Sequence, residues 1–182
     1  MRRFYRFLNR TGLVALICLI SYAGAAAAIS ASSIDELTLA YLYNFLKFTE
    51  WPVADTINEM TICVSKSGRL AANLEALAGH LAQNKKVIIR PLETSKDPHT
   101  CQLLFLDQNE NSNNISQWLK QAANQPILTV SDKPDFLEMG GMIILIESDN
   151  RLQFEVDLTS VRNAGLNLNS QVLKIARDVR GK

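Results

Sequence analysis

Residues 140–179, GGMIILIESDNRLQFEVDLTSVRNAGLNLNSQVLKIARDV, carry the pattern that decides the fold of this chain. Two apolar runs, Met142–Glu147 and Leu152–Val156, flank the polar turn Ser148–Arg151. In the second run apolar and polar residues alternate, so one face of a strand is apolar and the other is polar. Two such runs joined by a short polar turn predict an antiparallel hairpin, which we expect on the edge of a sheet.

Two short helices are predicted after this hairpin. Asp157 is suited to cap the first helix, which stops at Gly165, because a carboxylate accepts hydrogen bonds from free N–H groups and glycine commonly ends helices. Asn169 or Ser170 caps a last helix that runs to about Val179.

Upstream of residue 140, apolar runs of strand length alternate with helical patterns. The predicted strands are Met60–Val64, Lys86–Leu92, Cys101–Leu106 and Pro126–Val130, and the predicted helices between them are Leu70–Leu81 and Ile115–Ala123. Short apolar strands separated by helices are typical of a parallel sheet covered on both faces. The sequence therefore predicts an α/β fold, a Rossmann-like three-layer sandwich with a mixed, mostly parallel sheet and a C-terminal antiparallel hairpin.

A longer helix is predicted before these elements. Ser33 and Glu36 form a capping box, and the helical segment continues to Glu50, where Trp51 and Pro52 stop it. Apolar residues cover more than one face of this helix, so one face meets the sheet and a second must meet something else. That second face packs either against a neighbouring helix of the same chain, or against a second copy of the protein in a homodimer or a partner protein.

The N-terminus has the features of a secretory signal peptide over residues 1–28, with cleavage between residues 26 and 31. Four arginines precede the apolar stretch Leu13–Ile20, and small residues follow it. A retained membrane anchor is the alternative, but this stretch is shorter than the roughly 18 residues that a membrane span needs. Export would leave a single domain over residues 33–180. Its formal charge would fall from +1 to about −3 with the loss of the arginines, which argues against nucleic acid as a partner.

Cys63 and Cys101 are the cysteines that remain after export, and thiols can oxidise outside the cytoplasm. A disulfide between them is the simplest interpretation, and two separate buried thiols are the alternative. Closing a loop of about 39 residues would stabilise the fold by roughly 4 kcal/mol.

No arrangement of residues typical of catalysis or metal binding is found. His80 and His99 are the only histidines, and neither has the spacing of a zinc ligand pair. Nucleophile elbows, phosphate-binding loops and dinucleotide fingerprints are absent as well. We therefore expect no enzyme activity, no metal and no cofactor.

One loop is a candidate for binding a small ligand. Ser65, Lys66, Ser67 and Gly68 follow a predicted strand and open a predicted helix, where backbone N–H groups favour an anion. Asp107, Ser131 and Asp132 would lie in the same region, at the carboxyl ends of neighbouring strands. Ordinary capping of a strand-to-helix turn explains the same residue types.

Two blocks of sequence are distinctive: TLAYLYNFLKFTEWP at residues 38–52 and the stretch that follows Gly140 and Gly141. Together they resemble the YfiR/HmsC-like family. The resemblance implies a periplasmic protein that does no chemistry. Such a protein binds the periplasmic domain of an inner-membrane diguanylate cyclase and represses it, which lowers cyclic di-GMP and biofilm formation. It also implies release by an outer-membrane lipoprotein, and homodimers. A periplasmic sensor that binds a small ligand is the alternative function.

The outward side of the hairpin and the last helix is the predicted partner surface. Its residues are Arg151, Gln153, Glu155, Arg162, Gln171 and Lys174, with Trp51 as an aromatic anchor. A solvated polar face is the alternative for the polar members of this set.

Overall fold

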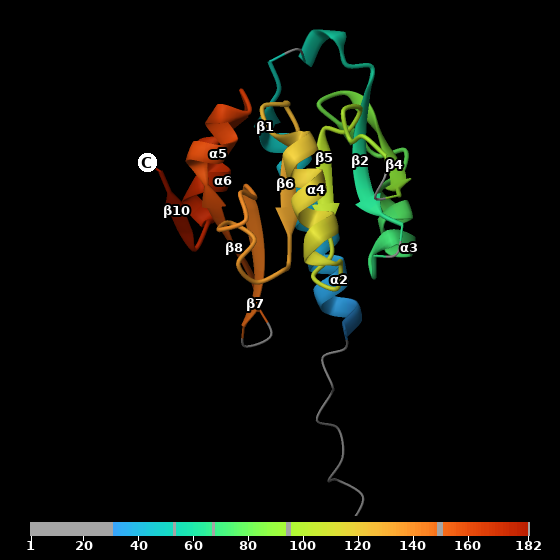
Figure 1. Cartoon of the computed structure of the whole chain (residues 1–182). Coiled ribbons are helices and arrows are strands. Elements are labelled where there is room, and N and C mark those ends of the chain that lie inside the picture. Colours follow the sequence, from blue (N-terminus) through green and yellow to red (C-terminus); the bar gives the residue numbers. More distant parts are fainter. Residues whose placement is uncertain (1–30, 53, 67, 94–95, 149–150, 182) are drawn as a thin grey trace, which may run out of the picture. The chain divides into compact units, whose positions relative to one another are not determined.

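A mixed sheet forms the centre of the protein, with helices on both of its faces (Figure 1). This computed structural model describes residues 31–52, 54–66, 68–93, 96–148 and 151–181, and at 31–33 and 54 it describes the backbone alone. The predicted signal peptide lies outside the described residues.

The sheet runs in the order β10-β8-β7-β6-β5-β2-β4-β3. Its strands are β2 (Glu59–Ser65), β3 (Leu81–Ala82), β4 (Lys85–Leu92), β5 (Leu103–Leu106), β6 (Leu128–Ser131), β7 (Ile143–Ser148), β8 (Arg151–Asp157) and β10 (Asp178–Arg180). The pairs from β4 to β7 are parallel, whereas β7 with β8 and β3 with β4 are antiparallel. A separate antiparallel pair joins β1 (Thr49–Glu50) to β9 (Asn167–Leu168). The mixed, mostly parallel sheet and the C-terminal hairpin are therefore confirmed.

Two hydrophobic clusters, one on each face of the sheet, make up the three layers. The helices are α2 (Ala31–Phe48), α3 (Ala71–Leu74), α4 (Ser112–Ala122), α5 (Leu158–Asn163) and α6 (Ser170–Ile175), with short 3-10 turns η1 (Ala54–Thr56) and η2 (Glu75–Leu77). The α2-side cluster joins Phe45 of α2 to Phe154 of β8 and includes residues of α3, α5 and α6. The α4-side cluster packs Trp118 of α4 against Phe136 and Ile144.

Local signals set the starts of the last two helices and the end of α5 as predicted. The Asp157 side chain accepts a hydrogen bond from the Ser160 N–H at 3.0 Å, and the Asn169 side chain accepts one from the Gln171 N–H at 2.8 Å. Gly165 follows α5 with a φ of +72°, a conformation that side chains with a Cβ rarely adopt.

The end of the chain corrects one prediction. The last helix stops at Ile175 rather than near Val179, and residues 178–180 form β10, which pairs in parallel with β8. Val179 lies opposite Val156 and is buried in the α2-side cluster. The hairpin is therefore not the outermost part of the sheet, because β10 covers the free backbone edge of β8.

The helix predicted at Leu70–Leu81 is also shorter than expected. Helical structure ends at Leu77, and Gly79 has a φ of +80°. The Gly79 N–H donates to the Val87 carbonyl at 2.9 Å, and the Val87 N–H donates to the His80 carbonyl at 2.8 Å. Bonds to β4 thus replace the helical ones, and Leu81 and Ala82 form β3.

Much of the second apolar face of α2 is covered by the same chain. Tyr41 and Tyr43 are half-buried against the α2-side cluster, and their hydroxyls donate to the carbonyls of Leu152 and Leu81 at 3.1 and 2.6 Å. Leu37 remains 42% exposed. α2 begins at Ala31, two residues before the predicted cap Ser33, whose side chain is outside the described set.

Candidate functional site

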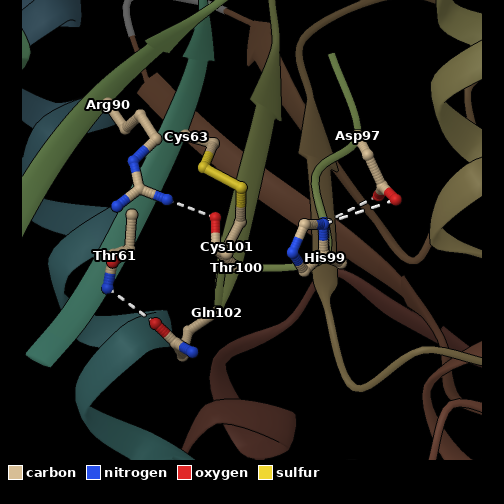
Figure 2. Close-up of a disulfide and its surroundings, with 8 residues drawn as sticks. All are labelled: Thr61, Cys63, Arg90, Asp97, His99, Thr100, Cys101 and Gln102. Atoms are coloured by element: carbon tan, nitrogen blue, oxygen red, sulfur yellow. Dashed lines mark hydrogen bonds and ion pairs between the residues drawn. A yellow bond between two sulfur atoms is a disulfide. The ribbon is translucent and has the colours of Figure 1, made fainter. Parts of the chain in front are cut away.

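A disulfide joins Cys63 of β2 to Cys101, which lies just before the neighbouring strand β5 (Figure 2). The two Cα atoms are 5.7 Å apart, and both side chains are buried in the α4-side cluster. The predicted disulfide is confirmed. Figure 2 shows His99 turned to Asp97, with Nδ1 3.3 Å from the carboxylate. Because Cys101 is oxidised in the disulfide, it offers no free thiol that the neighbouring His99 could activate.

Glu155 links the last two strands of the sheet. Its carboxylate accepts hydrogen bonds from Arg177 at 2.9 and 2.5 Å, and its second oxygen lies 3.6 Å from Arg180. Arg180 also donates to Glu138 at 2.6 Å, which lowers the pKa of Glu138. Only 13% of the Glu155 side chain is exposed. This predicted surface residue is therefore the half-buried end of an ion-pair network whose arginines reach solvent.

Arg151 and Gln153 are exposed on the same face of β8 as Glu155. In register, Gln153 lies opposite Ile146 and Glu155 lies opposite Ile144. Cross-strand neighbours in an antiparallel pair share a face, and both isoleucines pack in or against the α4-side cluster. These polar side chains therefore lie on the face of the sheet that also carries the α4-side cluster.

The remaining predicted partner residues belong to the opposite face. Gln171 and Lys174 are exposed on α6, whose Val172 is buried in the α2-side cluster. Arg162 is exposed on α5, which packs on the same cluster, and it donates to the Gly181 carbonyl at 3.0 Å. The predicted surface is thus divided into a β8 face (Arg151, Gln153, Glu155) and an α6 face (Arg162, Gln171, Lys174).

Trp51 lies in the α2-side cluster, with 4% of the residue exposed. Its indole Nε1 has no hydrogen-bond partner among the described residues. A side chain in this position is not available as an exposed anchor, so we leave it out of the proposed surface.

Two backbone donors of the loop predicted to bind an anion are already occupied. The Lys66 N–H donates to the Leu92 carbonyl and the Gly68 N–H to the Ser65 carbonyl, both at 2.9 Å. Ser65 is buried and its hydroxyl donates to Glu110, and Lys66 forms an ion pair with Glu93 at 3.3 Å. Ser67 lies outside the described residues. The helix that follows has only four residues, so its dipole adds little.

Next to this loop, Arg69 is surrounded by carboxylates from three other parts of the chain. It forms ion pairs with Asp35 at the start of α2 and with Asp132 after β6, the latter at 3.0 Å. Its backbone N–H donates to Asp107, after β5, at 3.0 Å. Burial and the negative charge of Asp107 raise the pKa of Asp132. A cavity of about 390 Å³ opens beside Arg69 and Asp132.

Within the described part of the chain, no group of three or more His, Cys, Asp or Glu side chains is arranged to hold a metal ion. The helices described in the structure also include none that is long and apolar enough to cross a membrane.

A family model described as YfiR/HmsC-like matches residues 35–177. The chain belongs to the YfiR/HmsC-like family. The match spans both sequence blocks that carry the resemblance, from α2 to the segment after α6. At the level of the family, membership supports a periplasmic regulator of diguanylate cyclase, in a family that is regulatory rather than catalytic.

Arg69 and Asp35 of this YfiR/HmsC-like chain were not predicted as site residues, although Asp107 and Asp132 were placed at the same edge of the sheet. Arg69 directly follows the predicted Ser65–Gly68 loop, which was a usable signal. Asp35 gives no such signal, because only the packing of α2 on the sheet brings it to Arg69.

Proposed function

We propose that this protein binds the periplasmic domain of an inner-membrane diguanylate cyclase and represses it, which lowers cyclic di-GMP and, with it, exopolysaccharide and biofilm output. The observation that carries the proposal is membership of the YfiR/HmsC-like family across residues 35–177. The predicted export signal at residues 1–28 fits the compartment.

Repression of this kind requires binding alone. The protein must bind the inactive conformation of the cyclase more tightly than the active one. A preference of about 3 kcal/mol shifts the equilibrium roughly 150-fold. An α/β domain with a stable recognition surface is sufficient for that task.

We propose the β8 face as the surface that contacts the cyclase. Arg177 and Arg180 are held by Glu155 at hydrogen-bond or ion-pair distance, so their guanidinium groups have little conformational freedom to lose on binding. Arg151 and Gln153 continue this polar face along the exposed hairpin. Arginine is favoured at interfaces because its planar guanidinium can donate two parallel hydrogen bonds to one carboxylate.

The α6 face is then left for another contact. We propose that an outer-membrane lipoprotein releases the brake by binding the regulator, and that the regulator is a homodimer. Exposed apolar side chains on this side include Ile175, of which 68% is exposed. Sedimentation of the purified protein checks the dimer, and a monomer at micromolar concentration would remove it from the proposal.

The test of the function combines deletion with complementation. Deleting the gene should raise cellular cyclic di-GMP, and the chain with its N-terminal 28 residues should restore the low level, while a version lacking them should not. Equal cyclic di-GMP in the deletion and parent strains, with the cyclase expressed, would contradict the proposal.

A pull-down from solubilised membranes tests the surface. Arg151→Glu combined with Gln153→Glu should lose the cyclase, whereas Gln171→Glu combined with Lys174→Glu, the matched pair on the opposite face, should retain it. Retention by the first pair with loss by the second would assign the cyclase to the α6 face instead.

A periplasmic sensor for a small ligand is the second candidate function. The cavity beside Arg69 favours it, since about 390 Å³ falls within the range of roughly 300 to 1,000 Å³ that is usual for small-molecule sites.

A further inference from the structure

The cavity beside Arg69 lies in a fork of the sheet. β6 pairs with β7 only at Val130 with Ile143 and at Ser131 with Ile144. Beyond that point β7 continues to Ser148 as half of the hairpin, while the chain after Ser131 turns away through Asp132. The fork opens at the carboxyl ends of the parallel strands.

Ligands of open α/β sheets bind at this edge, where successive crossovers leave the sheet on opposite faces. After β2 the chain enters α3, whose Leu74 is buried in the α2-side cluster, and after β5 it enters α4 on the other face. Arg69 and Gln108 come from these two diverging loops, and both line the cavity. The position in the fold is thus that of a ligand site.

Much of the cavity lining is apolar. The apolar residues of the lining are Ile34, Pro134, Ile144, Leu145, Ile146 and Leu152. Ile34 and Ile146 are only half-buried, so apolar surface remains for a ligand to cover.

The charged groups at the cavity are mostly negative. Asp132 and Glu147 line it, Asp35 and Asp107 lie next to it, and Arg69 forms the ion pairs with the three aspartates. Lys133 Nζ is held by the carbonyls of Gln108 and Glu110 at 3.1 and 3.4 Å. The site therefore carries an excess of negative charge.

Arg69 is not free to receive an anion. Its three side-chain nitrogens each face a carboxylate, from Asp35, Asp107 and Asp132. Asp132, in contrast, accepts one bond on each oxygen, from the Gln108 N–H at 2.6 Å and from Arg69 at 3.0 Å. Each carboxylate oxygen has a second lone pair, so Asp132 has capacity for one more donor.

We infer that this cavity binds a small organic cation, an apolar group that carries an ammonium, with the ammonium on the Asp132 carboxylate and the apolar part against the apolar side chains of the lining. The raised pKa of Asp132 agrees with this arrangement. Burial and the negative charge of Asp107 disfavour the ionised carboxylate, and a bound cation would stabilise it. Glu147, exposed at the end of β7, adds a second carboxylate at the rim.

Three probes that share a ring and differ in charge test the inference: phenethylammonium, phenethyl alcohol and phenylacetate. Each is titrated into the isotope-labelled mature protein, and amide shifts are followed by NMR at neutral pH. Phenethylammonium should bind at least tenfold more tightly than the alcohol, phenylacetate should bind least, and the shifts should centre on Ile144–Leu152 and Asp132.

Two variants locate the cation. Asp132→Asn should weaken the binding of phenethylammonium at least tenfold and leave the affinity for the alcohol unchanged. Asp55→Asn, a matched change of an exposed carboxylate in η1, should leave both affinities unchanged. Glu147→Gln should weaken the binding of phenethylammonium by a smaller factor. Because Glu147 is exposed, this substitution should not disturb the fold. Tighter binding of phenylacetate, no binding of any probe at millimolar concentration, or equal affinities in the Asp132 and Asp55 variants would overturn the inference. Because these are binding measurements on the isolated protein, their outcome is independent of whether a cyclase is the partner.

Discussion

The carboxylate of Glu155 on β8 accepts two hydrogen bonds from the guanidinium of Arg177, at 2.9 and 2.5 Å. Arg177 directly precedes β10, the strand that covers β8. The pair therefore fastens the end of the chain to the hairpin and also fixes the charged groups that we assign to the partner surface. Under the proposed function, Glu155 serves both stability and recognition.

Glu155→Ala should consequently destabilise the fold. We expect a loss of about 1 kcal/mol in the free energy of unfolding, since charge-assisted bonds to partly exposed arginines contribute modestly. Urea unfolding measures it, with Gln153→Ala as the neighbouring control, which should change stability by less than about 0.5 kcal/mol. If Glu155→Ala is as stable as the parent protein, the network serves recognition alone.

Removal of the disulfide should have a larger effect. The bond joins residues 38 positions apart, and the chain-entropy model gives about 4 kcal/mol for a loop of this length. Cys63→Ala with Cys101→Ala should lower the urea midpoint accordingly, and reductant should then have no further effect on that double variant. An unchanged midpoint in the parent protein under reductant, with the bond shown to be open, would contradict this prediction.

Features set by neighbouring residues were predictable from the sequence. The caps at Asp157 and Asn169 and the stop at Gly165 depend on side chains within the same turn, and the structure has all three. The disulfide was also correct, because the predicted export left one pair of cysteines. β10 was missed, since three residues such as Asp178–Arg180 have no pattern of their own and pair only because β8 offers a free edge.

The candidate site was predictable only in part for the same physical reason. The sequence placed Asp107 and Asp132 at the carboxyl edge of the sheet, where the cavity is found. It also predicted an anion site at the Ser65–Gly68 loop, but the N–H groups of Lys66 and Gly68 donate hydrogen bonds to carbonyls of the same chain. The division of the partner residues between two faces followed from the packing of α6, which no local signal specifies.

The adjacent glycines 140 and 141 should tolerate alanine differently. At Gly141 a Cβ would overlap the ring of Phe136, which is fully buried, so Gly141→Ala should destabilise the fold by about 2 to 3 kcal/mol. At Gly140 a Cβ has open space, and only its φ of +95° is unfavourable, so about 1 kcal/mol is expected.

Thermal or urea unfolding distinguishes the two causes. Phe136→Leu in the Gly141→Ala background should recover part of the lost stability, because the smaller side chain relieves the overlap. The same change in the Gly140→Ala background should only add its own destabilisation. Recovery in both backgrounds, or in neither, would show that the Phe136 contact is not the cause.

The raised pKa of Asp132 should appear in the pH dependence of stability. Above the ordinary value of 3.8 the folded protein still binds a proton that the unfolded chain has released, so this group makes the parent protein less stable as pH rises through its folded pKa. Asp132→Asn lacks that contribution. Urea unfolding from pH 3.5 to pH 7 should therefore show the parent protein losing stability relative to Asp132→Asn as pH rises, in a window that begins at about 3.8. Saturating phenethylammonium should lower the upper end of that window, because a bound cation favours the ionised carboxylate and so lowers the pKa of Asp132 in the folded protein. Parallel pH profiles for the two proteins would mean that Arg69 fully compensates the charge of Asp132, and the cavity would then have no unbalanced carboxylate to attract a cation.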